Sequence, residues 1–174
     1  MSSQRLSVVD LLVSSEVSHV SGGNERCPVA QEMKFAEIEK SLGELRSGRM
    51  IVIADDEDRE NEGDLMIAAE MITPEVINFV ATYARGLICL AMTGERLDQL
   101  ELEPMVLHNT ANLGTPFTVS IDAQGRGVTT GIWSYDRARI DLAAVDPRIR
   151  AEDLARPGHV FPLRPSDTWV LHGE

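Results

Sequence analysis

The chain has 174 residues and a net charge of -12, with 43% apolar and 25% charged residues. This length fits one domain, and the composition is that of globular rather than disordered proteins. The acidic excess argues against nucleic acid or an anionic membrane surface as partner. No apolar stretch approaches the ~20 residues of a transmembrane helix, and the start makes a poor secretory signal, so we expect a cytoplasmic protein.

The first third of the chain divides into a tail and the start of a domain. Residues 1–33 are Ser-rich and broken by Gly22-Gly23 and Pro28, which predicts a flexible N-terminal tail. Its apolar patch at 8–13, interrupted by Asp10, predicts one or two helical turns at most. The domain is expected over 34–174. Cys27 and Cys89 have no neighbours at zinc-ligand spacing, which indicates free thiols.

Apolar periodicity and capping residues predict alternating helices and strands in the domain. The expected helices cover 35–47, 74–84, 94–100 and 134–145, with Thr73 capping the second and Ser134 the last. The expected strands cover 50–54, 65–71, 87–92 and 118–121, and residues 152–156 read as a short turn. This order predicts an α+β fold, an α/β-type sandwich with a mixed β-sheet and flanking helices.

An acidic segment follows the first expected strand of the domain. Residues 55–64 read D-D-E-D-R-E-N-E-G-D and hold seven carboxylates and one arginine. Such a cluster raises its own pKa values unless a cation compensates it, and hard oxygen ligands suit magnesium or manganese. A solvated acidic turn is the alternative. The flanking strands favour a functional loop at a sheet edge.

Two other acidic motifs fit this segment poorly. A calcium-binding EF-hand loop that begins at Asp56 fails, because Asn61 and Ile67 stand where glycine and glutamate belong. An aspartyl phosphotransferase motif is weakened by Glu60, which stands where a hydroxyl or β-branched residue belongs.

Four ordered motifs resemble those of the 3,4-dihydroxy-2-butanone 4-phosphate synthase family. They are the acidic segment 55–64, G-T-P-F-T-V at 114–119, G-V-T-T-G at 127–131 and R-P-G-H-V-F-P-L at 156–163. The resemblance implies a lyase of riboflavin biosynthesis that converts ribulose 5-phosphate into a four-carbon phosphate and formate. It also implies a homodimer and a Mg²⁺ or Mn²⁺ cofactor.

The resemblance also assigns roles to individual residues. It implies that Glu60 binds the metal, and that Arg59, Glu60 and Asp64 contact the sugar phosphate. Glu62, Asp64 and His159 would be catalytic, with His159 completing a site shared across the dimer interface. Cys89 would line the same pocket, although a cysteine in an apolar strand also fits simple core packing. Thr129 and Thr130 also fit plain loop residues.

The chain departs from the family pattern in two places. The family continues into a G-H-T-E-A motif and a later C-E segment, whereas residues 166–174 read S-D-T-W-V-L-H-G-E, and His172 falls about four positions too early to replace the metal-binding histidine. Without that segment apolar sheet surface would be bare, so we expect tight dimerisation or aggregation. Trp133 and Tyr135 stand where the family prefers small residues, and would either reshape substrate access or cover apolar surface.

Three hypotheses about function remain open at this point. The chain is a synthase of this family, a diverged enzyme that acts on another sugar phosphate, or a catalytically silent truncated paralogue that dimerises with a complete synthase.

Overall fold

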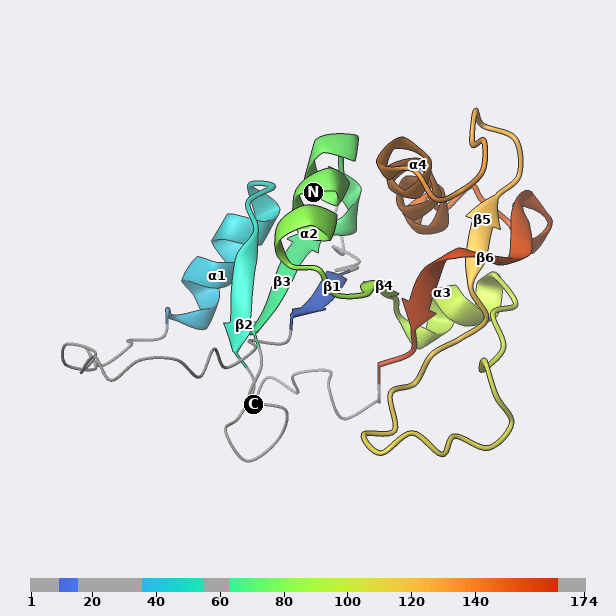
Figure 1. The fold of residues 1–174 in the computed structure, drawn as a ribbon, viewed down its shortest axis with the longest axis horizontal. Helices are drawn as coiled ribbons and strands as arrows, with labels where there is room; N and C mark the ends of the chain where they lie inside the picture. The colour runs from blue at the N-terminus through green and yellow to red at the C-terminus, as the bar shows by residue number, and fades with distance from the viewer. Residues whose placement is uncertain (1–9, 16–35, 55–62, 166–174) are drawn as a thin grey trace, which may run out of the picture.

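The computed structural model describes residues 10–15, for the backbone alone, together with 36–54 and 63–165. It contains one six-stranded sheet in the order β2-β3-β1-β4-β6-β5 with flanking helices, which confirms the expected α+β class (Figure 1). The strands are β1 (Asp10–Ser15), β2 (Ile51–Ala54), β3 (Gly63–Ala68), β4 (Ile88–Ala91), β5 (Ile121–Ala123) and β6 (Leu154–Leu163). The sheet is mixed, because β4 and β6 run parallel and the other pairs antiparallel.

The helices lie close to their expected positions. They are α1 (Ile38–Arg46), α2 (Pro74–Tyr83), α3 (Gly94–Gln99) and α4 (Ser134–Val145), with short 3₁₀ turns at Ala69–Met71 and Ala151–Asp153. Thr73 caps α2 as expected, since its side chain accepts a hydrogen bond from the Val76 amide at 3.3 Å. Ser134 is the first residue of α4 rather than its cap. None of the described helices is long and apolar enough to cross a membrane.

The expectation of a flexible tail is wrong for residues 10–15, and so is the expectation of helical turns there. They form β1, which pairs with β3 on one side and β4 on the other. Two neighbouring strands satisfy the backbone of a segment too short to be stable alone, and this tertiary pairing overrides the weak local signal. The rest of the expected tail, including Cys27, lies outside the described residues.

Two strand expectations and one turn expectation are only partly right. The strand expected at 65–71 ends at Ala68 and continues as a 3₁₀ turn, whereas the strand expected at 118–121 is found at Ile121–Ala123. The turn expected at 152–156 is confirmed only at its start, because the 3₁₀ turn ends at Asp153 and the long strand β6 begins at Leu154. Proline and glycine at 157, 158 and 162 obscure this strand in the sequence, because they weaken any strand pattern.

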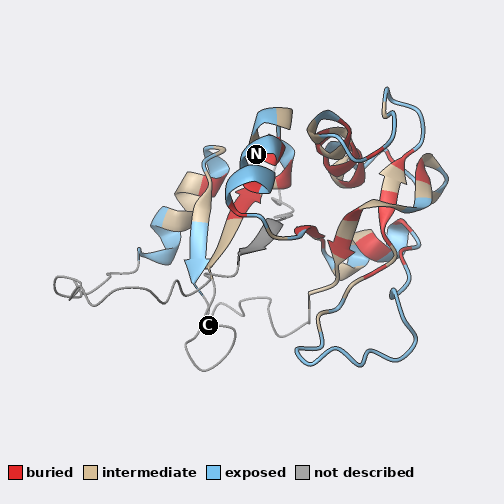
Figure 2. Ribbon diagram, viewed as in Figure 1, coloured by how far each residue is buried: buried red, intermediate tan, exposed pale blue. Residues whose placement is uncertain are grey.

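Helix α4 joins two buried clusters above the sheet (Figure 2). Ala138 packs with Ile67 of β3, Ile88 of β4 and buried residues of α2. Ile140, two residues further along and on another side of the helix, packs with Ile121 and Val160 of β5 and β6. One helix therefore fixes both halves of the sheet relative to each other.

Candidate active site

The acidic segment connects two strands that are paired at the point where it begins and ends. Ala54, the last residue of β2, pairs with Gly63, the first residue of β3. Residues 55–62, with the expected site residues Arg59, Glu60 and Glu62, lie outside the described residues. Asp64 is the member of the acidic motif whose side chain the structure places.

Asp64 and Cys89 lie on the same face of the sheet, on strands separated by β1. Asp64 pairs with Ser14 and Cys89 with Leu12, and positions two apart on one strand share a face. Burial of Cys89, and secondarily the negative charge of Asp64, raise the pKa of the Cys89 thiol to about 12. Cys89 is thus a buried, free and protonated thiol.

His159 lies in an irregular stretch of the β5–β6 ladder. Ile121 pairs with Val160, but the next residue, Asp122, pairs with Ala155, so 156–159 leave the regular register. The side chains of Ser120, just before β5, and of Asp122 in β5 bind the amides released there. The Gly158 amide donates to Ser120 Oγ at 3.1 Å, and the His159 amide donates to Asp122 Oδ1 at 3.0 Å.

The carboxylate of Asp122 also holds the ring of His159. Its Oδ2 lies 2.9 Å from His159 Nδ1. The Asp122 side chain is 18% exposed and that of His159 41% exposed, so the ring reaches solvent while its anchor is mostly covered. No sequence pattern pointed to Asp122, which lies in a short strand far from His159 along the chain.

The G-V-T-T-G loop closes over this pair. Asp136, in the first turn of α4, accepts hydrogen bonds from the Thr129 amide at 3.0 Å, the Thr129 hydroxyl at 2.7 Å and the Gly131 amide at 3.0 Å. Burial raises the pKa of the Asp136 carboxyl, but these hydrogen bonds outweigh it and leave the pKa below its usual value. Thr129 is therefore a structural anchor of the loop.

Gly131 is the point at which the loop touches the histidine. Its φ is +85°, and a Cβ there would overlap His159 Nδ1 and both carboxylate oxygens of Asp122. Only glycine fits both the left-handed backbone and this close approach. The third and fourth sequence motifs are thus in direct contact.

Within the described part of the chain His159 lies far from Asp64 but close to Cys89, which pairs with Phe161, two residues from His159 on the neighbouring strand β6. No hydrogen bond or ion pair among the described residues joins His159 to Asp64 or Cys89. β6 is separated from β3 by β4 and β1. Likewise, no group of three His, Cys, Asp or Glu side chains that could hold a metal ion occurs among the described residues.

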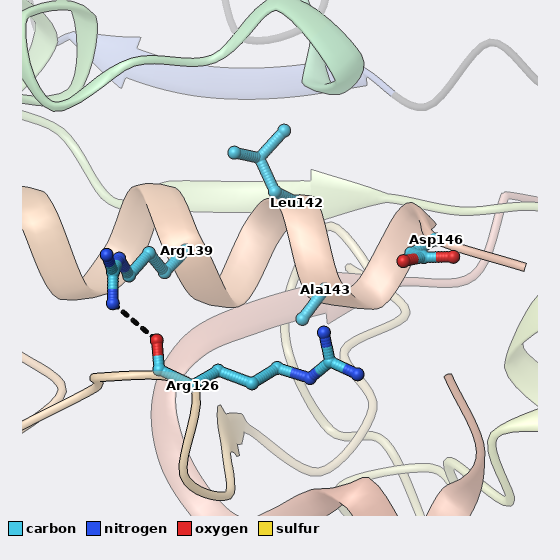
Figure 3. A pocket seen from close by; sticks show the side chains of 5 residues that line it. All are labelled: Arg126, Arg139, Leu142, Ala143 and Asp146. Atoms are coloured by element: carbon cyan, nitrogen blue, oxygen red, sulfur yellow. Dashed lines mark hydrogen bonds between the residues drawn. The ribbon is translucent and has the colours of Figure 1, made fainter. Parts of the chain in front are cut away.

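A shallow pocket on α4 lies apart from the expected site residues (Figure 3). It is lined by Arg126, Arg139, Leu142, Ala143 and Asp146. Arg139 donates a hydrogen bond to the Arg126 carbonyl and stacks 4.2 Å from the centroid of the Tyr135 ring. Tyr135 therefore packs along its own helix, whereas Trp133 is 67% exposed and covers little surface.

Known proteins give a consistent assignment of the chain. Residues 39–173 match the family model of 3,4-dihydroxy-2-butanone 4-phosphate synthase. A riboflavin biosynthesis protein RibBA of Aquifex aeolicus is 52% identical over 142 residues, which are 81% of this chain and 35% of that protein. A 3,4-dihydroxy-2-butanone 4-phosphate synthase of Agrobacterium fabrum is 50% identical over 139 residues, which are 80% of this chain and 65% of that protein.

A solved structure agrees with the sequence comparison. It is a crystal structure of 3,4-dihydroxy-2-butanone 4-phosphate synthase in complex with two magnesium ions, with a TM-score of 0.75 and 42% identity. The match covers 77% of this chain and 62% of that one, so the chain spans less than two thirds of these relatives' length. On the strength of the family model and these identities, the chain belongs to the 3,4-dihydroxy-2-butanone 4-phosphate synthase family.

Proposed function

We propose that the chain converts D-ribulose 5-phosphate into 3,4-dihydroxy-2-butanone 4-phosphate and formate in riboflavin biosynthesis. Family membership supports this, and one observation carries it furthest. Two of the four family motifs, far apart in sequence, meet where Gly131 packs on His159 and Asp122. A histidine half exposed and held by a carboxylate is suited to acid/base chemistry.

The reaction requires protons to be moved repeatedly at carbon and at hydroxyl groups of the sugar. We assign this role to Glu62, Asp64 and His159, because carboxylates and imidazole are the usual general acids and bases. Arg59, Glu60, Asp64 and Cys89 are proposed to contact the substrate. The neutral thiol of Cys89 serves there as a contact rather than as a nucleophile, since its pKa is raised to about 12.

The acidic segment is proposed to hold a divalent cation, Mg²⁺ or Mn²⁺, through Glu60. Its carboxylates are the hard oxygen donors that these ions prefer. When bound, the cation supplies polarisation of the substrate carbonyl. The magnesium-bound structure of a family member supports this choice of ion.

We further propose a cytoplasmic homodimer whose active site combines residues of two chains. The separation of His159 from Asp64 in one chain, with β1 and β4 between their strands, supports a shared site. Exposed apolar side chains in the 105–113 loop support association, among them Leu107 at 99% and Leu113 at 58% exposure. The free Cys89 thiol is in keeping with a reducing compartment.

The test is to incubate the full chain with ribulose 5-phosphate and Mg²⁺, and separately with Mn²⁺, and to measure formate. We expect equimolar formate and a four-carbon phosphate identified by mass spectrometry. Glu62→Gln should abolish both, and Glu75→Gln, a matched change at an exposed residue of α2, should not. Absence of formate with both ions would overturn the proposal.

A diverged sugar-phosphate enzyme is the second candidate, because the bulky, exposed Trp133 directly follows the loop that packs on His159. A thermal-shift screen would then show stabilisation by another sugar phosphate but not by ribulose 5-phosphate. Stabilisation by ribulose 5-phosphate alone would exclude this candidate.

A further inference from the structure

The contact between Asp122 and His159 has two points, which distinguishes it from a simple ion pair. Oδ1 accepts the His159 amide at 3.0 Å, and Oδ2 lies 2.9 Å from Nδ1 of the ring. An ionised carboxylate can only accept hydrogen bonds. The ring nitrogen that faces it must therefore carry the proton, and in the neutral imidazole the lone pair is then on Nε2.

The surroundings prevent this pair from rearranging. Gly131 touches both partners and leaves no room for a Cβ. Its loop is tied to α4 by the Asp136 hydrogen bonds. On the other side Gly158 lies so close to the backbone of Ile121 and Asp122 that a Cβ there would overlap it. Backbone thus packs closely against the Asp122–His159 pair, while the ring still reaches solvent.

Backbone satisfaction alone does not account for this arrangement. Ser120 binds the Gly158 amide through a neutral hydroxyl, which shows that the irregular stretch can be satisfied without charge. Asp122 instead places a carboxylate in a mostly covered position and directs its second oxygen at the ring. Such a carboxylate beside a histidine is a common means of fixing tautomer and ring orientation.

We propose that Asp122 is a positioning residue for His159, which fixes the Nδ1–H tautomer and presents the Nε2 lone pair for proton transfer. Its catalytic consequence rests on the proposed role of His159 in the lyase reaction. The tautomer is a property of the protein alone, and can be measured whether or not formate is produced.

The decisive variant is Asp122→Asn, which keeps the shape of the side chain. The amide can accept the His159 backbone hydrogen bond and donate its NH₂ to the ring, so that Nδ1 becomes the acceptor and the proton moves to Nε2. Long-range ¹H–¹⁵N NMR of the full chain, at a pH where the neutral ring is observed, distinguishes the two tautomers. His159→Gln identifies the His159 signals among the four histidines.

We expect the wild type to show the Nδ1–H form and Asp122→Asn to show the Nε2–H form. In the formate assay, Asp122→Asn should lower kcat by about 10–100-fold, the usual loss when a group that orients a functional histidine is removed. KM should change little, since other residues bind the substrate. Asp122→Glu, which restores a carboxylate, should recover part of the loss.

The matched control is Asp98→Asn. Asp98, in α3, also pairs with a basic side chain, that of Arg164. The Asp98 side chain is 70% exposed, and Arg164 follows the end of β6, five residues after His159. Asp98→Asn should leave both the His159 tautomer and kcat unchanged. A wild-type Nε2–H ring, or an Asp122→Asn protein that keeps the wild-type tautomer or the wild-type kcat, overturns the proposal. A wild type without formate production but with the expected tautomer change would instead count against the proposed reaction.

Discussion

The two sides of the proposed site are built by different means. Asp64 and Cys89 owe their relative positions to backbone ladders, because each lies on a strand paired with β1. His159 owes its position to side chains, since Ser120 and Asp122 bind the amides that leave the β5–β6 ladder. The first arrangement fixes a distance across a sheet, and the second fixes the orientation of one ring. A site that combines acids with an oriented base has use for both.

The largest expected effect is on the acidic side. Asp64→Asn removes a proposed proton-transfer group and should lower kcat for formate release by about 10²–10⁴-fold. Glu70→Gln, an exposed residue just beyond β3, is the control and should retain activity. If Asp64→Asn retains full activity, the acidic side of the site does not include Asp64.

The reactivity of Cys89 tests the burial of the same side. Its raised pKa of about 12 should make iodoacetamide labelling at pH 8 roughly 10³-fold slower than in the unfolded chain, where the thiolate is abundant. Asp64→Asn should accelerate labelling only modestly, because burial is the larger cause of the shift. Labelling is measured by peptide mass spectrometry. Rapid labelling of Cys89 in the folded protein would contradict its burial in the sheet.

Helix α4 packs against both buried clusters and carries a buried carboxyl, that of Asp141. Burial, opposed by the nearby Arg137 charge, raises the pKa of Asp141 to about 8, and neither of its oxygens has a hydrogen-bond partner. The folded state therefore holds a proton that the unfolded chain releases above about pH 4. The contribution of Asp141 to the free energy of unfolding should be highest below that pH. It should fall as the pH rises to about 8, by at most about 1.4 kcal/mol per pH unit.

Asp141→Asn removes this titration. The urea unfolding free energy of Asp141→Asn should lose that part of the decline between pH 5 and 8. Glu152→Gln, at an exposed residue of the Ala151–Asp153 turn, is the control and should keep the wild-type pH dependence. An unchanged pH dependence in Asp141→Asn would mean that the buried carboxyl does not titrate in this range.

Mixing two inactive variants asks whether the two sides belong to different chains. Asp64→Asn and His159→Gln, refolded together in equal amounts, form half mixed dimers by statistics. If each site combines the two sides across a two-fold axis, one site of every mixed dimer is intact, and about one quarter of the wild-type activity returns. If both sides act within one chain, no activity returns.

Local patterns predicted the helices well, because they carry their own signals. Thr73 with Pro74, and the apolar spacing that ends at Gly48, mark helix ends with short-range chemistry. The strands were less predictable. β6 carries two prolines and a glycine and becomes a strand only because β4 and β5 lie on either side of it.

The site residues could likewise be predicted only where the sequence carries a local signal. The acidic segment was conspicuous by composition, and His159 could be found through its motif. Asp122 could not, since its significance lies in a partner 37 residues away that only the folded ladder brings near. Asp136 was equally hidden, because its hydrogen bonds run backwards to a loop rather than to its own helix.

The central position of β1 has a consequence for how the chain is made. β1 is synthesised before the strands it pairs with, residues 63–68 and 88–91, and without it the structure has no ladder between β3 and β4. Closing such long loops is slow, and an unpaired strand edge invites association with other chains. A strand synthesised before its partners thus completes the sheet late. It also lies outside the residues 39–173 that match the family, so a fragment cut to the family boundary would lack the strand that joins its two halves.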